Sequence, residues 1–348
     1  MIADERDINQ LDELYAGRNP YHGELHDHGA TGGTSDGKRP LSHWKGALEA
    51  LEMDFAAILD HKQVRHMYLP EWEDGLFIGG TEPGTVIDDS GAEVKGMHYN
   101  MLFAEPGPLE ELLAEFPEFA FTGGAEGHFI YPHFTVERFG KLVDAVKAKG
   151  GFFVHPHPKK MMVSENPLDY WFRDETGLEV IYRAPERETT AANYALWTDL
   201  LAAGKRIWAT AGGDWHKCAH DAALTTIYAE AHETAAYFPH LRAGDFTCGG
   251  VGIQMCIGDT RMGGICDFAG QRLILRVGDF HRSLKNPEHK YRLDLYDDRG
   301  VVCSRIFSCD EPFYLAVDAE AAAFYRAEVV DVNRNLRIAL GNPIWQKQ

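Results

Sequence analysis

The residues of this sequence best suited to chemistry begin with two histidines near its start. His26 and His28 follow a short apolar segment and are followed at once by Gly29. Alternate side chains of an extended strand point to the same face, so both imidazoles would leave the end of a strand on one side. Two imidazoles that converge in this way form a natural first half of a metal site. Because a chain with 17 histidines can contain such a pair by chance, the prediction depends on further donors.

Further donors follow other segments that are predicted to be short buried strands. They are Asp60 and His61 after residues 55–59, Glu82 after 76–80, His157 after 152–154, and Asp214 and His216 after 207–211. Nitrogen and oxygen donors without thiolates suit zinc, manganese or iron, and composition does not choose between these metals. Ions held by such groups activate water, and a carboxylate such as Glu82 could bridge two of them. The donor set therefore predicts hydrolysis.

The elements that must position these donors alternate between strand and helix. The clearest helix covers residues 135–149, because apolar side chains recur on one face at Val136, Phe139, Leu142, Val143 and Val146. Helices are also predicted at 40–53 and 191–203. Residues 96–103, which contain His98, are predicted to form the hairpin partner of strand 76–80. This alternation predicts a parallel sheet covered by helices, as a barrel or an open layer. In a barrel the functional groups gather at the carboxyl ends of the strands, so the donors should share one site.

The pattern changes at about residue 247. Short alternating runs at 273–277 and 291–295 are separated by turn residues such as 297–300, which predicts a small β-sandwich. A chain of 348 residues suits one large domain and one smaller domain. We therefore expect a barrel domain at 1–246 and a β-sandwich domain at 247–348.

Composition bounds the partners and the compartment. The chain has 34 basic and 53 acidic residues, a formal charge of −19, which opposes approach to nucleic acid and to anionic membranes. We therefore expect a small anionic substrate, no nucleic acid and no membrane partner, whereas the oligomeric state is left open. The sequence shows neither a secretory signal nor an apolar run of about 18 residues, so a cytoplasmic location is expected. The six cysteines form no Cys-x-x-Cys pair, which argues against a zinc ribbon.

Six motifs in order resemble those of the PHP superfamily, which is named after polymerase and histidinol phosphatase. They are Leu25-His26-Asp27-His28, Ser35-Asp36-Gly37, Leu59-Asp60-His61, Gly80-Thr81-Glu82, the segment from Gly150-Gly151 to His157-Pro158, and Gly213-Asp214-Trp215-His216. The resemblance covers roughly residues 20–220. It implies a distorted (β/α)7 barrel that holds two or three divalent ions, which would be Zn, Mn or Fe.

The same resemblance implies three sets of metal ligands. By motif, the first ion would be held by His26, His28, Glu82 and Asp214, the second by Glu82, His98 and His157, and the third by His61 and His216. Asp36 could complete the third set, although Gly32-Gly33-Thr34 makes its loop longer than is usual in the family. The His-Pro motif is doubled, and counting from Gly150-Gly151 favours His157 over His155 as the ligand.

Two residues are predicted to support the chemistry without being assigned as ligands. Asp60 would be a ligand or, preferably, a carboxylate that orients a ligating histidine. Arg183 follows the strand predicted at 178–182 and could clamp an anionic substrate, with a surface ion pair to Glu186 or Glu188 as the alternative. The loop lysines Lys159 and Lys160 are further candidates for binding phosphate.

The resulting hypothesis is a metal-dependent phosphoesterase in which a metal-bound hydroxide attacks the substrate. The trailing β-domain and the terminal segment at 341–345 are similar to a branch of the family that includes carbaryl-hydrolase-like enzymes. That branch cleaves carbamate or ester bonds, so a carbamate, ester or amide hydrolase is the nearest alternative. A non-catalytic metal-binding module is a further alternative, and the full ligand set disfavours it.

Overall fold

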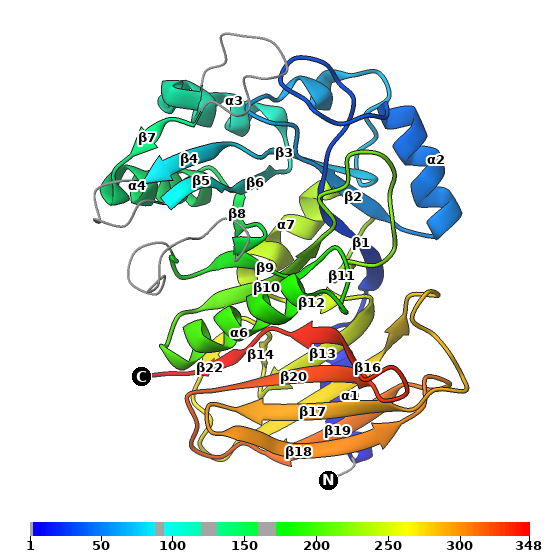
Figure 1. The fold of residues 1–348 in the computed structure, drawn as a ribbon. Helices are drawn as coiled ribbons and strands as arrows, with labels where there is room; N and C mark the ends of the chain where they lie inside the picture. Colours follow the sequence, from blue (N-terminus) through cyan, green and yellow to red (C-terminus); the bar gives the residue numbers. More distant parts are fainter. Residues whose placement is uncertain (1–2, 88–93, 120–130, 159–171) are drawn as a thin grey trace.

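The computed structural model describes residues 3–87, 94–119, 131–158 and 172–348, and it contains an α/β part and a β part (Figure 1). Five helices accompany the sheet of the α/β part: α2 (Leu41–Leu51), α3 (Pro106–Glu115), α4 (Val136–Ala148), α6 (Glu188–Ala202) and α7 (Thr234–Ala243). Helix α4 begins at Thr135, whose side chain accepts a hydrogen bond from the Arg138 N–H, and it buries the apolar face predicted from the sequence. Among the described residues, none of the helices combines the length and the apolar character needed to cross a bilayer.

The sheet of the α/β part is mixed. Strands β1 (Asn19–Asp27), β2 (Phe55–Ile58) and β3 (Phe77–Thr81) are parallel to one another. Strand β6 (Asn100–Phe103) is antiparallel to both of its neighbours, β3 and β8 (Phe152–His155). Strands β9 (Thr176–Tyr182) and β10 (Ile207–Gly212) follow and run parallel to β8. Every residue of β2, β3, β6, β8, β9 and β10 is buried, because this sheet is covered on both faces.

The structure does not confirm a (β/α)7 barrel. The paired strands run in the order β10, β9, β8, β6, β3, β2, β1, and no ladder joins β10 to β1 in the described chain. Beyond β10 the two ends are joined by hydrogen bonds: the Asp214 N–H donates to the His26 carbonyl at 2.7 Å and the His28 N–H to the Trp215 carbonyl at 2.9 Å, which forms an isolated parallel bridge between Asp27 and Trp215. Asp214 has a φ of 53°, so the chain has already left strand geometry there. Strand β11 (Thr225–Ala229) instead pairs with β1, in the antiparallel direction.

The predicted hairpin at 96–103 is only half right. Strand β6 does pair with β3, but residues 94–98 form a separate strand, β5, which pairs with β4 (Gly84–Ile87). Strand β7 (His133–Phe134) completes this three-stranded sheet, and two short 3-10 helices, η1 (Arg65–Tyr68) and η2 (Pro117–Phe119), lie in connections. The chain changes sheets at Tyr99, whose N–H donates to the Pro83 carbonyl at 3.0 Å.

The β part contains two layers around its own apolar core. One layer has the order β14 (Thr260–Arg261), β13 (Val251–Ile257), β16 (Arg272–Phe280), β19 (Phe313–Asp318). The other is β21 (Leu336–Gly341), β20 (Phe324–Asp331), β17 (Tyr291–Asp297), β18 (Gly300–Phe307), with β15 (Ile265–Cys266) and β22 (Ile344–Gln346) at its side. Leu275, Val277, Leu293 and Val329 belong to the core between the layers.

The two parts share secondary structure. Strand β12 (Phe246–Gly249) pairs with β11 on one side and with β21 on the other, so the large sheet continues from one part into the other. The N-terminal helix α1 (Glu5–Leu14) buries Leu11 in an apolar cluster with Ile274 of the β part. The division at residue 247 therefore stays a prediction.

Candidate metal centre

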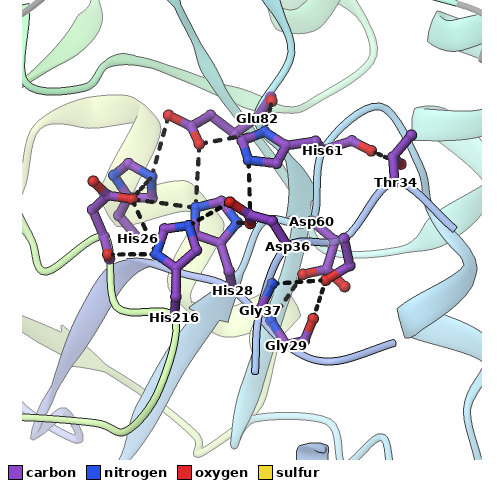
Figure 2. Close-up of polar contacts among 12 residues, drawn as sticks. His26, His28, Gly29, Thr34, Asp36, Gly37, Asp60, His61, Glu82 and His216 are labelled. Atoms are coloured by element: carbon purple, nitrogen blue, oxygen red, sulfur yellow. Dashed lines mark hydrogen bonds and ion pairs between the residues drawn. The ribbon is translucent and has the colours of Figure 1, made fainter. Parts of the chain in front are cut away.

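Eight of the nine predicted ligands lie at or just beyond the carboxyl ends of strands, and Asp36 lies in the loop between β1 and α2. All nine converge in the α/β part, and Figure 2 shows His26, His28, Asp36, His61, Glu82 and His216 among them. Within the described chain they form three groups, and the ligand atoms of each group lie within 4.8 Å of one another. We call them the central group (His26, His28, Glu82, Asp214), the His98 group (Glu82, His98, His157) and the Asp36 group (His28, Asp36, His61, His216). The structure adds His28 to the Asp36 group, to which the family resemblance had assigned only His61, His216 and Asp36.

Glu82 lies at the centre of the arrangement and is 1% exposed. Its Oε1 is 3.4 Å from His26 Nε2, 2.9 Å from His98 Nδ1 and 3.2 Å from His157 Nε2. Its Oε2 is 3.2 Å from His28 Nε2. One carboxylate thus contacts imidazoles of both the central and the His98 group, which is the arrangement required of a bridging ligand.

The buried charges depend on one another. Burial raises the pKa of Glu82, but the positive charges of His98 and His26 outweigh it and hold that pKa well below its ordinary value. Burial lowers the pKa of His28, but the carboxylates of Asp214 and Glu82, 3.5 and 3.2 Å from its Nε2, outweigh it and raise the pKa to about 10. Buried carboxylates need a positive partner. Protons on His26 and His28, whose pKa values are raised, supply this charge, and divalent cations would supply it in their place.

The imidazole rings are oriented as metal ligands usually are. Nδ1 of His26 donates to Glu179 Oε1 at 3.0 Å, Nδ1 of His61 to the Glu82 carbonyl at 2.6 Å, and Nδ1 of His216 to the Asp214 carbonyl at 2.9 Å. Each of these bonds leaves Nε2 to face the groups. The buried Nε2 of His26 and both ring nitrogens of His28 make no hydrogen bond within the described chain. Buried polar atoms are usually hydrogen-bonded, and a bound cation would satisfy these nitrogens.

Asp36 reaches the site in spite of its long loop. Gly32 and Gly33, with φ of 79° and 65°, let the chain turn back, and Asp36 lies 3.0 Å from His216 Nε2 and 3.5 Å from His61 Nε2. Burial raises the pKa of Asp36, but the hydrogen bonds from His216 and His61 lower it far below its ordinary value. The insertion therefore does not separate Asp36 from its predicted partners.

Asp60 lies outside all three groups, which corrects the prediction of a catalytic role. Its Oδ1 accepts a hydrogen bond from the Gly29 N–H at 2.8 Å, and its Oδ2 accepts one from the Thr31 hydroxyl. Figure 2 shows Asp60 beside Gly29, away from Glu82. Its Oδ2 is 3.8 Å from Nδ1 of His66, which belongs to none of the groups. Asp60 therefore secures the loop that follows His28 and orients no candidate ligand.

The structure separates the two histidines of the doubled His-Pro motif. The ring of His155 packs against Phe153 and Phe172, with centroids 5.1 and 4.8 Å apart, and burial lowers its pKa to about 3. His157 instead joins the His98 group. His155 is therefore a neutral core residue.

Arg183 lies at the edge of the central group, against one of its candidate ligands. Its Nη2 is 3.3 Å from Asp214 Oδ2, and its guanidinium is near the rings of Tyr182 and Trp215, with centroids at 5.1 and 5.6 Å. The Tyr182 hydroxyl donates to the same Oδ2 at 2.7 Å. Within the described chain this ion pair replaces the alternative pairs with Glu186 or Glu188. Lys159 and Lys160 lie outside the described residues.

The sequence analysis did not identify the side chains that contact the candidate ligands and hold them in place. Glu179 and Tyr182 both face the site because β9 bulges at Val180: Thr210 pairs with Glu179 and Ala211 with Ile181. A regular strand would have pointed residues 179 and 182 to opposite faces. Tyr131 was also missed, and its hydroxyl is 2.9 Å from His98 Nε2. One signal in the sequence could have identified Glu179: it is an acidic residue in an otherwise apolar strand segment.

Comparison with known proteins finds similarity only among solved structures. A scan against family models and a search of curated proteins find no match. A two-domain protein from Bacteroides vulgatus that contains a predicted PHP-like metal-dependent phosphoesterase matches at 12% identity and a TM-score of 0.39, over 93% of this chain and 95% of that one. A protein from Bifidobacterium adolescentis assigned to the metal-dependent phosphoesterases matches at 17% and 0.37, over 58% and 90%.

Endonuclease Q, in complex with a 27-mer duplex substrate that has an abasic lesion at the active site, matches at 11% identity and a TM-score of 0.41, over 64% of this chain and 57% of that one. Identities and TM-scores this low carry no information on the substrate of this chain. The prediction that nucleic acid is excluded is corrected, because Endonuclease Q, one of the matching structures, is bound to a duplex substrate. The net charge of −19 describes the whole surface and not the field at the metal groups.

Proposed function

We propose that this protein is a metal-dependent phosphoesterase of the PHP type. The observation that carries the proposal is the overlap of three donor groups, in which Glu82 belongs to two and His28 to two. Overlapping groups would place ions close enough to act on one phosphoryl group. The nine residues His26, His28, Asp36, His61, Glu82, His98, His157, Asp214 and His216 would hold two or three divalent ions, of Zn, Mn or Fe.

Bound ions would lower the pKa of a water molecule and neutralise negative charge on the phosphoryl oxygens. The protein contributes ligands that are already oriented: hydrogen bonds from Nδ1 fix the rings of His26, His61 and His216. Asp214 is held at Oδ2 by Tyr182 and Arg183, so Oδ1 is presented to His28 at 3.5 Å. Little rearrangement would be needed for these side chains to act.

The charge of the loaded site favours an anionic substrate. Two divalent ions add four positive charges to a site whose candidate ligands contain three carboxylates, Asp36, Glu82 and Asp214. Arg183 adds one more positive charge, and its side chain is 37% exposed, so the guanidinium is accessible at the edge of the central group. We propose that it contacts a phosphoryl oxygen of the substrate. The site would therefore attract phosphoesters even though the chain as a whole is acidic.

The proposal is tested with protein stripped by a chelator and reloaded with Mn²⁺, Zn²⁺ or Fe²⁺. The substrates are an aryl phosphomonoester, an aryl phosphodiester, an aryl ester, an aryl carbamate and a duplex oligonucleotide with an abasic site. We expect metal-dependent cleavage of at least one phosphoester. Because the guanidinium would contact substrate, Arg183→Met should lower kcat/KM by roughly 100-fold, and Arg183→Lys by less. Turnover of the aryl ester or carbamate alone, with every phosphoester intact, would refute the phosphoesterase.

A further inference from the structure

We infer that Glu179 is a positioning residue that couples the central group to the His98 group. One carboxylate oxygen, Oε1, accepts a hydrogen bond from His26 Nδ1 at 3.0 Å, and the other, Oε2, accepts one from the His157 N–H at 2.7 Å. His26 belongs only to the central group and His157 only to the His98 group. The inference depends on the metal binding proposed above, and it assigns a role to a residue that is itself in none of the groups.

Burial strengthens both hydrogen bonds to the Glu179 carboxylate. Glu179 and His157 are 1% exposed and His26 is fully buried, so water does not compete for these hydrogen bonds. The backbone of Glu179 is fixed as well, because its carbonyl accepts a hydrogen bond from Asn193 Nδ2 of α6 at 2.9 Å. The carboxylate therefore holds the two ligands from a rigid strand, as the partners of metal-bound histidines commonly do.

The contact with His157 acts on backbone and not on the ring. His157 has a φ of 31°, a conformation that side-chain-bearing residues rarely adopt. The hydrogen bond from its N–H to Glu179 supports this backbone, and with it the position of the ring whose Nε2 lies 3.2 Å from Glu82. A change at Glu179 should therefore move His157 as well as release the His26 ring.

The neighbouring strand leaves room for this arrangement. Gly212 ends β10 beside Glu179, and a Cβ there would lie 2.6 Å from the His26 Cβ and closer still to Glu179 Oε1. Such distances are too short for real contacts, so Gly212→Ala would displace the carboxylate, the His26 side chain or both. Because Gly212 does not have a positive φ, the alanine itself suits the backbone. Gly212→Ala therefore disturbs the same contacts without replacing Glu179 itself.

Glu179→Gln gives the direct test, because glutamine has nearly the same shape but only one accepting oxygen. One of the two donors, His26 Nδ1–H or the His157 N–H, then faces the amide NH2, and the repulsion displaces the shared side chain from both contacts. We expect the affinity for Mn²⁺ to fall 10- to 100-fold for the ions of both groups, measured by competition with a chromophoric chelator on stripped protein. Gly212→Ala should weaken both ions in the same direction. His98→Ala, which removes a ligand of one group, should mainly weaken one ion.

Two controls separate positioning from general loss of stability. Glu328→Gln also removes a fully buried carboxylate; it lies on β20 of the β part, contacts Arg337 of β21 and Tyr194 of α6, and contacts none of the nine ligands. It should lower the melting temperature but leave Mn²⁺ affinity within twofold of wild type. Gly46→Ala, where a Cβ would meet nothing within 4 Å, is the control for Gly212→Ala. The visible spectrum of bound Co²⁺ should change in Glu179→Gln and not in either control.

The outcomes are distinct. Mn²⁺ affinities within twofold of wild type and an unchanged Co²⁺ spectrum in Glu179→Gln would overturn the inference, as would the loss of one ion only. Wild-type protein that binds no Mn²⁺ would overturn it together with the proposed function. Wild-type protein that binds Mn²⁺ but cleaves no phosphoester would overturn the phosphoesterase alone, and the role of Glu179 would still be decided by metal affinity.

Discussion

Replacement of Glu82 by glutamine should remove most of the stabilisation that metal ions confer on this protein. Glu82 contacts His26, His98 and His157 through Oε1, and it belongs to two of the three donor groups. Glutamine keeps the shape but lacks the negative charge, so both the central and the His98 group would lose their shared anionic ligand. The Asp36 group contains no atom of Glu82 and should keep its ion.

The size of the effect follows from linkage. An ion that binds only the folded protein stabilises it by about 2.7 kcal/mol when its free concentration is 100 times its dissociation constant. Three ions would contribute about 8 kcal/mol, and the ion left in the Asp36 group about 2.7 kcal/mol. If only the two groups that share Glu82 are occupied, the variant would retain almost none. In either case the metal-dependent stabilisation should fall by about 5 kcal/mol.

The measurement is the free energy of unfolding in denaturant, with and without Mn²⁺, for wild type and Glu82→Gln. The value in chelator is the reference for each protein, because Glu82 also pairs with histidines in the metal-free state. Glu328→Gln is the control for loss of a buried carboxylate. A Glu82→Gln protein that gains as much stability from Mn²⁺ as wild type, within about 1 kcal/mol, would refute the assignment of Glu82 as a shared ligand.

Three further predictions test other residues. Asp60→Asn should lower the free energy of unfolding by about 1–3 kcal/mol, because hydrogen bonds to the loop after His28 are weakened, and metal content measured by mass spectrometry should stay unchanged; loss of metal would contradict this. His155→Phe should keep its metal, whereas His157→Ala should lose one ion, and the reverse pattern would restore His155 as the ligand. Burial and the charge of His281 lower the pKa of His22 to about 4, so below pH 6.5 the unfolded chain takes up a proton that the folded chain does not. Stability should fall by up to about 3 kcal/mol between pH 6.5 and 4, and His22→Gln should flatten this slope; equal slopes would exclude His22 as the cause.

Local patterns predicted the helices α2, α4 and α6 and missed α1, α3 and α7. Helix α4 covers Val136–Ala148 where 135–149 was predicted, because its three- and four-residue apolar spacing and its Thr135 cap are properties of one short segment. Helix α1 was missed, although Asp4 and Asp7 cap each other in a pattern visible in the sequence. Such signals need no knowledge of the rest of the chain.

Pairing between distant strands was predicted less well. Residues 96–103 alternate as one strand would, yet the chain changes sheets at Tyr99, so β5 pairs with β4 and β6 with β3. The expected barrel also depends on whether β10 pairs with β1, and the described chain joins the two ends through an isolated bridge between Asp27 and Trp215 instead of a ladder. Neither feature follows from periodicity, because register is a relation between segments far apart in sequence.

The sequence by itself determined the types of donor and their places after the strands, because a polar side chain that ends a buried apolar run must leave the sheet at its edge. Only the tertiary structure decided which way each side chain points. It separated His157 from His155, turned Asp60 toward the loop at Gly29, and brought Glu179 to His26 through a bulge in β9. The physical reason is that side-chain direction depends on backbone φ and on strand register, and both are set by contacts between distant parts of the chain.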